Sequence, residues 1–129
     1  MRRILLDTHA YFWWATDDRK LSRVADAAIR DDETQVLVSV VTAWELATKA
    51  RIGKWPGAAA IVTDIEDALA SRGFEPLAIT LTHAKLAGFL PGAHRDPFDR
   101  MLAAQARIEN VPLVTVDAAF REFGIQTLW

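Results

Sequence analysis

Cysteine is absent from the 129 residues of this chain. Disulfide frameworks, thiol nucleophiles and zinc–thiolate sites are therefore excluded. No apolar run approaches the roughly 18 residues of a membrane-spanning helix. Only Ile4, Leu5 and Leu6 separate the N-terminal arginines from Asp7, which is too short an apolar stretch for a signal peptide. We therefore expect a cytoplasmic protein with no membrane partner.

A strong excess of charge is lacking as well. Fifteen basic and seventeen acidic residues give a formal net charge of −2. This excludes a surface that is basic all over, but it leaves room for a local basic groove. Glycine-rich phosphate-binding loops of the G-x-x-x-x-G-K or G-x-G-x-x-G type are also missing. With 51% hydrophobic residues, the composition predicts one globular domain spanning residues 1–129.

Apolar, often β-branched segments alternate with segments of helical periodicity along the whole chain. We predict strands over residues 3–6, 35–38, 74–79, 111–116 and 125–128. We predict helices over residues 9–15, 23–30, 40–52, 58–72, 82–89, 97–109 and 117–123. This alternation is typical of an α/β fold with a parallel sheet and helices on both faces. In such sheets the functional site lies at the carboxyl ends of the strands.

Four acidic residues fall at that edge of the predicted sheet. Asp7 and Asp117 directly follow strands. Glu45 lies in the first turns of one helix, and Asp99 lies in the first turn of the helix that Asp96 and Pro97 open. Because crossover helices run antiparallel to the strands, their N-termini open on the same edge. We therefore expect four carboxylates from distant segments to meet there.

Each acid also has a local structural interpretation. Asp7 or its neighbour Thr8, as well as Asp96 and Asp117, can each cap the helix that follows. Thr42 and Glu45 have the spacing of a capping box, with Thr42 at the cap. Glu45 and Lys49 also have the spacing of a surface ion pair. The helix dipole would favour Asp99 in a first turn. For each acid taken singly, capping and function remain open alternatives.

The four acids as a set would require a positively charged partner. Carboxylates that are packed together repel one another and raise each other's pKa unless a cation intervenes. Hard oxygen ligands suit Mg²⁺ or Mn²⁺, which keep several waters and bind substrate phosphates. The set therefore predicts a site for Mg²⁺ or Mn²⁺.

The segments that carry these acids form a recognisable series. They are ILLDTH at 4–9, WELATK at 44–49 with GK at 53–54, HRDPFDRMLAAQA at 94–106 and LVTVD at 113–117. In order, spacing and total length the chain resembles PIN-domain proteins, specifically the VapC toxins of type II toxin–antitoxin pairs. The resemblance covers essentially the whole chain.

This resemblance implies a metal-dependent endoribonuclease with a three-layer α/β/α fold and a five-stranded parallel sheet ordered 3-2-1-4-5. The family's catalytic, metal-binding acids map to Asp7, Glu45, Asp99 and Asp117. Thr115 matches a hydroxyl residue that supports the site. For the third acid, Asp96 and Asp99 compete, and cap geometry favours Asp96 as the helix cap and Asp99 as the ligand. The implied partners are an RNA substrate, a cognate VapB-type antitoxin and a second copy of the chain.

Basic and aromatic residues accompany the acids. Five basic side chains could either contact RNA phosphates or form a solvated surface. They are Lys49, Arg51, Lys54, Arg95 and Arg100. Histidines 9, 83 and 94 are candidates for proton transfer, although packing roles are favoured for them. We assign Phe12, Trp13 and Trp14 to the core, a dimer interface or an antitoxin contact before RNA stacking.

Two other functions compete with the nuclease. A receiver-like phosphoacceptor domain needs an acceptor Asp at the end of a central strand, but the second and third predicted strands end at Ser39 and Ile79 without one. A catalytically silent PIN-like binding module would tolerate the loss of acids, yet all four are present. We therefore favour the nuclease over both alternatives.

Overall fold

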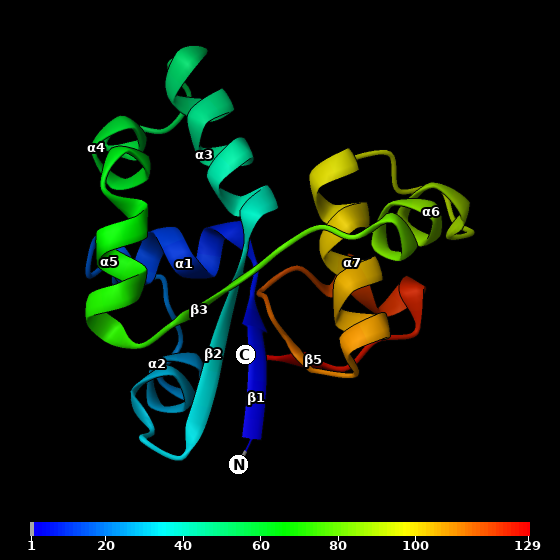
Figure 1. The fold of residues 1–129 in the computed structure, drawn as a ribbon, viewed down its shortest axis with the longest axis horizontal. Coiled ribbons are helices and arrows are strands. Elements are labelled where there is room, and N and C mark those ends of the chain that lie inside the picture. The colour runs from blue at the N-terminus through cyan, green and yellow to red at the C-terminus, as the bar shows by residue number, and fades with distance from the viewer. Residues whose placement is uncertain (1) are drawn as a thin grey trace.

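The structure, a computed structural model, describes residues 2–129 and contains one five-stranded sheet (Figure 1). All neighbouring strands pair in parallel, in the order β3-β2-β1-β4-β5. The strands are β1 (Arg2–Leu6), β2 (Thr34–Ser39), β3 (Glu75–Leu77), β4 (Leu113–Val114) and β5 (Thr127–Leu128). The predicted strand order and the α/β/α class are therefore confirmed.

Helices cover both faces of this sheet. In chain order they are α1 (Thr8–Ala15), α2 (Arg23–Arg30), α3 (Val40–Arg51), α4 (Ala58–Thr63), α5 (Ile65–Arg72), α6 (Leu81–Phe89), α7 (Pro97–Glu109) and the 3-10 helix η1 (Ala118–Phe123). Figure 1 shows α1, α2, α4 and α5 on one side of the strands, with α6 and α7 on the other. Within residues 2–129 no helix has both the length and the apolar character needed to cross a membrane.

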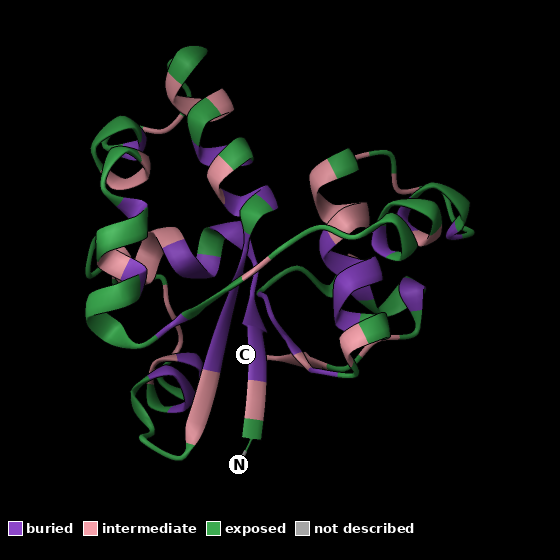
Figure 2. Cartoon of the chain, in the orientation of Figure 1, coloured by how far each residue is buried: buried purple, intermediate pink, exposed green. Residues whose placement is uncertain are grey.

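Alternation along the central strands divides the core into two apolar clusters. Ile4 and Leu6 of β1 pack in the cluster beneath α1, α2 and α5, whereas Leu5 packs in the cluster with α6 and α7. Successive side chains of a strand point to opposite faces, so one strand contributes to both clusters. The C-terminal parts of β1 and β2 are accordingly buried, as Figure 2 shows in purple.

The carboxyl ends of the strands meet the N-termini of three helices. Asp7, directly after β1, caps α1, and Ser39, the last residue of β2, caps α3. In Figure 1, α1, α3 and α7 all begin near the upper ends of β1 and β2. This arrangement places residues from distant segments at one edge of the sheet.

Four predicted elements differ clearly from the structure, and one of them, the strand predicted over 125–128, is limited to Thr127–Leu128. The helix predicted over 58–72 is divided at Asp64, and the Thr63 hydroxyl donates to the Ala59 carbonyl at 2.6 Å, a bond that competes with regular helix bonding. The strand predicted over 74–79 is only three residues long and contains Pro76, which has no N–H to donate. The strand predicted over 111–116 is shorter because the Val111 N–H instead donates to the carbonyl of Ala106 at the end of α7.

Candidate active site

A cleft of about 290 Å³ lies at the carboxyl edge of the sheet. Five acids line this acidic cleft, together with other side chains: Asp7, Glu45, Asp96, Asp99 and Asp117. They come from the segments that follow β1 and β4, from the second turn of α3 and from the start of α7. The predicted meeting of carboxylates is therefore confirmed, while their roles in catalysis and metal binding stay predictions.

Three of these acids also cap helices. Oδ1 of Asp7 accepts from the Ala10 N–H at 2.8 Å, and Oδ1 of Asp117 accepts from the Ala119 N–H at 2.9 Å. Asp96 accepts from the N–H groups of the first turn of α7. Because these caps engage one carboxylate oxygen each, capping and a place in the cleft are compatible.

Glu45 occupies its position for a different reason. The predicted capping box of Thr42 and Glu45 is wrong, because α3 begins at Val40 and its cap is Ser39, whose hydroxyl accepts from the Val41 N–H at 3.0 Å. The helix therefore starts three residues earlier than the capping box requires. Glu45 lies in the second turn and is only 6% exposed.

Burial also changes the partners of Glu45. The predicted surface ion pair with Lys49 is absent from the ion pairs of residues 2–129. Instead the Thr8 hydroxyl, which lies 3.3 Å from the hydroxyl of Thr42, acts to lower the pKa of Glu45 against the effect of burial. Thr8 is thus a site residue that the sequence indicated only as a possible cap of α1.

Burial is the main electrostatic feature of Asp7. Its side chain is 5% exposed, and desolvation raises its pKa to about 7. Hydrogen bonds from Thr115 and Ala10 oppose this rise, whereas the charges of Asp99 and Glu45 add to it. Thr115 therefore lies beside Asp7, while its role in supporting a catalytic site stays a prediction. A carboxylic acid with such a pKa is strongly stabilised by a nearby cation when it ionises.

The pKa values of Glu45 and Asp99 are raised as well. Burial raises the pKa of Glu45, and the charges of Asp99 and Asp96 raise it further. Burial also raises the pKa of Asp99, with the charges of Asp96 and Asp117 adding to the effect and a hydrogen bond from His94 opposing it. The cleft therefore holds more negative charge than its own side chains compensate.

The start of α7 distinguishes Asp96 from Asp99. Asp96 accepts from the N–H of Phe98 at 2.8 Å and from the N–H of Asp99 at 3.2 Å, as expected of the N-cap. Asp99 instead places Oδ2 2.8 Å from Nε2 of His94. The His94 ring itself packs edge-on against Phe123. His94 thus orients Asp99, a role that the sequence did not predict.

Arg100 does not line the acidic cleft. Its guanidinium donates to the backbone carbonyls of Ala87 and His94 at 2.9 Å each, and it also bonds to the carbonyl of Leu90. These bonds give Arg100 a structural role, and the RNA contact considered for it stays a prediction. The side chain ties the α6–α7 loop to α7, because a guanidinium offers several donors in one plane.

The remaining basic candidates fall into two groups. Lys49 and Lys54 line the acidic cleft. Arg51 and Arg95 are exposed and do not line it. The structure therefore places two of the five basic candidates next to the acids.

The histidines other than His94 have packing roles. His9 lines the cleft and stacks on Trp55, and burial together with Lys49 and Lys20 lowers its pKa. His83 is buried away from the cleft, with Nε2 3.0 Å from Oε2 of Glu109. The interpretation of packing over proton transfer fits both residues.

The donor chemistry of the cleft fits a hard divalent cation, although the side chains do not form a closed cage. Within residues 2–129, no three His, Asp or Glu side chains are grouped so that they could hold one ion together. Mg²⁺ does not need such a cage, because it keeps several waters and binds through one or two carboxylates. The buried carboxylates with raised pKa values are the groups that such an ion would stabilise.

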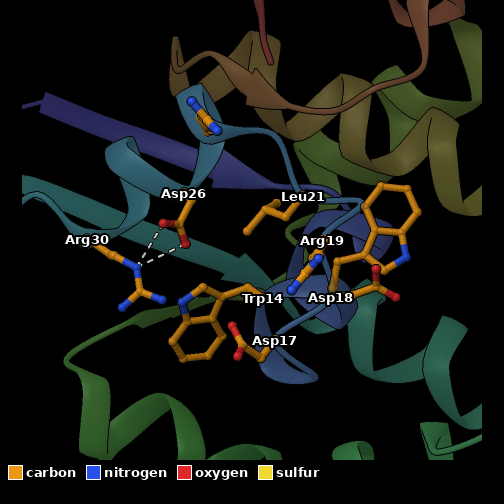
Figure 3. Close-up of a pocket in the computed structure, with 9 residues that line it drawn as sticks. Trp14, Asp17, Asp18, Arg19, Leu21, Asp26 and Arg30 are labelled. Atoms are coloured by element: carbon orange, nitrogen blue, oxygen red, sulfur yellow. Dashed lines mark hydrogen bonds and ion pairs between the residues drawn. The ribbon is translucent and has the colours of Figure 1, made fainter.

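A second cavity, of about 270 Å³, lies where α1 leads into α2 (Figure 3). Its walls alternate acids and arginines, and Arg30 bonds to both carboxylate oxygens of Asp26 at 3.0 Å. Trp13 and Trp14 line it, but none of the five acids of the cleft does. Its balanced charges therefore show no grouping of ligands comparable to the acidic cleft.

The fold and site define a class of α/β/α proteins with a carboxylate-lined cleft at the strand edge. The family model for the PIN domain matches residues 4–126, and the chain belongs to the PIN-domain family. Ribonuclease VapC22 of Mycobacterium tuberculosis (strain ATCC 25618 / H37Rv) is 28% identical over 124 residues, which cover 94% of this chain and 92% of that protein.

Solved structures share the fold. VapBC2 from Rickettsia felis, bound to a DNA fragment from its promoter, superposes with a TM-score of 0.68 at 17% identity, covering 97% of this chain and 96% of that one. VapC20 of Mycobacterium tuberculosis, described as a sarcin–ricin loop cleaving toxin, has a TM-score of 0.68 at 16% identity, with 95% of each chain covered. At these identities the likeness concerns the fold.

Proposed function

We propose that this protein is an endoribonuclease dependent on Mg²⁺ or Mn²⁺ and acts as the toxin of a type II toxin–antitoxin pair. The observation that carries the proposal is the acidic cleft, where carboxylates from four segments meet and burial raises the pKa values of three of them, Asp7, Glu45 and Asp99. Family membership and the 28% identity with a ribonuclease over 94% of the chain support it.

Each side chain of the cleft has a part in this proposal. Asp7, Glu45 and Asp99, assisted by Asp117, would hold the cation. A bound divalent ion stabilises charge on a scissile phosphate and lowers the pKa of water. Thr115 and Thr8 orient the carboxylates of Asp7 and Glu45 through hydrogen bonds.

Positive charge beside the acids supports the assignment of RNA as substrate. Lys49 and Lys54 line the same cleft and would contact RNA phosphates next to the cleaved bond. His94 holds Asp99 in place through the 2.8 Å contact. Binding, positioning and charge stabilisation are thereby divided among different residues.

A VapB-type antitoxin and a second copy of this chain are the proposed protein partners. Phe12, Trp13 and Trp14 are consecutive, and all three are only half-buried in the single chain. One helix cannot turn three consecutive rings into one core, so the remaining aromatic area is available to a partner. Light scattering of the purified chain, alone and with its antitoxin, tests this part of the proposal.

The activity is tested with purified protein and a pool of structured RNA. Cleavage is expected with Mg²⁺ or Mn²⁺ and should be lost in excess EDTA. The Asp99→Asn variant should be inactive under all of these conditions. RNA binding without cleavage in the presence of either ion would favour the silent binding module, and full cleavage in EDTA would refute metal dependence.

A further inference from the structure

The acidic cleft has aromatic and basic lining as well as its acids. His9, Lys49, Lys54 and Trp55 all line it. The ring centroids of His9 and Trp55 are 4.4 Å apart with an interplanar angle of 40°, and Nζ of Lys49 lies 5.8 Å from the centroid of Trp55. Two rings and two ammonium groups thus stand beside the carboxylates, and the acidic site alone does not require them.

A tight turn after α3 builds this part of the cleft. Gly53 has φ +72°, a left-handed conformation that favours glycine, and the Lys54 N–H donates to the Lys49 carbonyl at 2.9 Å. The turn brings Lys54 back beside Lys49. It also directs the next residue, Trp55, against α1, where its ring lies 5.3 Å from that of Phe12.

We propose that His9 and Trp55 form a subsite for an unpaired nucleobase of the RNA substrate, with Lys49 and Lys54 contacting the phosphates that flank that base. This subsite rests on the proposed function, because it takes RNA as the substrate. Every base has a π face, so stacking on such a wall tolerates many sequences. A base within a duplex is already stacked on its neighbours and is unavailable, so the subsite selects single-stranded or looped RNA.

Packing alone is the competing explanation for Trp55. The residue is half-buried and contacts the first core cluster through Phe12. Packing accounts for the contact of the Trp55 ring with Phe12, but it does not account for two lysines gathered beside that ring in a cleft of carboxylates. Cations and aromatic rings together are the usual components of single-strand binding.

Binding of a labelled oligoribonucleotide measures the subsite without relying on cleavage. Every protein in the experiment carries Asp99→Asn, which removes one carboxylate and, under the proposed function, prevents cleavage. The probe is a short fluorescein-labelled single strand of mixed sequence, titrated in Mg²⁺ at fixed salt and followed by anisotropy. Adding Trp55→Leu keeps apolar volume for the contact with Phe12 but removes the π system, whereas Trp55→Phe keeps a ring.

Trp44→Leu is the matched control. Trp44 lies on α3, is 59% exposed, packs against Phe98 and does not line the acidic cleft. We expect Trp55→Leu to raise Kd by about 5-fold to 150-fold, the range for the loss of one stacked base. Trp55→Phe should retain most of the affinity, and Trp44→Leu should leave Kd unchanged.

A second probe separates base stacking from damage to the fold. An oligonucleotide of the same length with abasic sites throughout retains its phosphates but has no base to stack. On this probe the background protein and its Trp55→Leu variant should bind equally. Three results would each overturn the subsite. Trp55→Leu could lose affinity equally on both probes, it could lose none on either, or the background protein could show no measurable binding.

Failure of the subsite and failure of the proposed function give different results. If wild-type protein does not cleave RNA but the Trp55 effect requires bases, the subsite holds and the nuclease assignment fails. If wild-type protein cleaves RNA and Trp55→Leu binds like its background, the nuclease holds and the subsite fails. The subsite also fails if Trp55→Leu weakens the binding of an antitoxin peptide but leaves the binding of RNA unchanged.

Discussion

Replacing Asp7 with asparagine in the metal-free protein should stabilise the fold, and the gain should grow with pH. Asp7 is 5% exposed, and burial raises its pKa from 3.8 to about 7. Asparagine can still accept the 2.8 Å hydrogen bond from the Ala10 N–H, because it caps helices about as well as aspartate. The substitution therefore removes the buried charge while preserving the cap.

The size of the gain follows from proton linkage. Below pH 3.8 the Asp7 carboxyl is protonated in both the folded and the unfolded chain, so its burial costs no charge. Between pH 3.8 and about 7 the folded chain keeps a proton that the unfolded chain has lost. The free energy of unfolding then falls by roughly 1.4 kcal/mol per pH unit. Over this interval the free energy of unfolding of wild type falls by about 4 kcal/mol relative to that of Asp7→Asn. This is a large change compared with a typical stability of about 5–15 kcal/mol.

Urea unfolding in EDTA at a series of pH values measures this difference. Asp117→Asn is the control, because it makes the same cap substitution at an exposed residue of the same cleft. Added Mg²⁺ should stabilise wild type more than Asp7→Asn, since a ligand of the folded state alone contributes about 2.7 kcal/mol at a hundredfold excess over Kd. A stability difference between wild type and Asp7→Asn that does not change from about pH 4 to about pH 8 would refute the reasoning.

Three further predictions concern other residues of the site. In an RNA cleavage assay, Asp99→Asn should abolish activity and Asp96→Asn should keep most of it, because asparagine replaces the cap but not the charge; the reverse result would make Asp96 the ligand. Arg100→Ala should lower the free energy of unfolding by about 1–3 kcal/mol, since it leaves buried carbonyls unpaired, and urea melts would show no change if these bonds are unimportant. Lys49→Ala and Lys54→Ala should each reduce the salt dependence of RNA binding by about one phosphate contact, and an unchanged slope would place those side chains away from the RNA.

Local features of the fold could be predicted from the sequence because short segments determine them. Ser22 and Asp96 cap their helices as expected, through bonds to N–H groups two or three residues away. Asn110 ends α7 in a left-handed conformation. Two predictions of this kind were wrong where side chains had a choice of partner. Ser39 rather than Thr42 caps α3, and the helix predicted over 58–72 is divided at Asp64.

The meeting of the acids could also be predicted, because alternating strands and helices place strand ends and helix starts on one edge. The strand order required the family resemblance, since periodicity alone does not say which strands are neighbours. Family membership, shown by the match over residues 4–126, agrees with that resemblance. The catalytic roles of the four acids remain predictions of the same resemblance.

Only the tertiary structure decided how strongly each acid is perturbed and what surrounds it. The pKa of Asp7 depends in part on Thr115, Asp99 and Glu45, which are distant in sequence. The hydrogen bond between His94 and Asp99 depends on how the α6–α7 loop folds back. Arg100 is an example of what the sequence could not decide. A basic residue beside an acid fits a phosphate contact as well as a structural role, until the positions of the backbone carbonyls that it binds are known. The sequence by itself therefore determined that Asp7, Glu45, Asp99 and Asp117 meet at one edge of the sheet. The packing of distant segments decided which of them are buried, paired or open to a ligand, because burial and long-range contacts exist only in the folded chain.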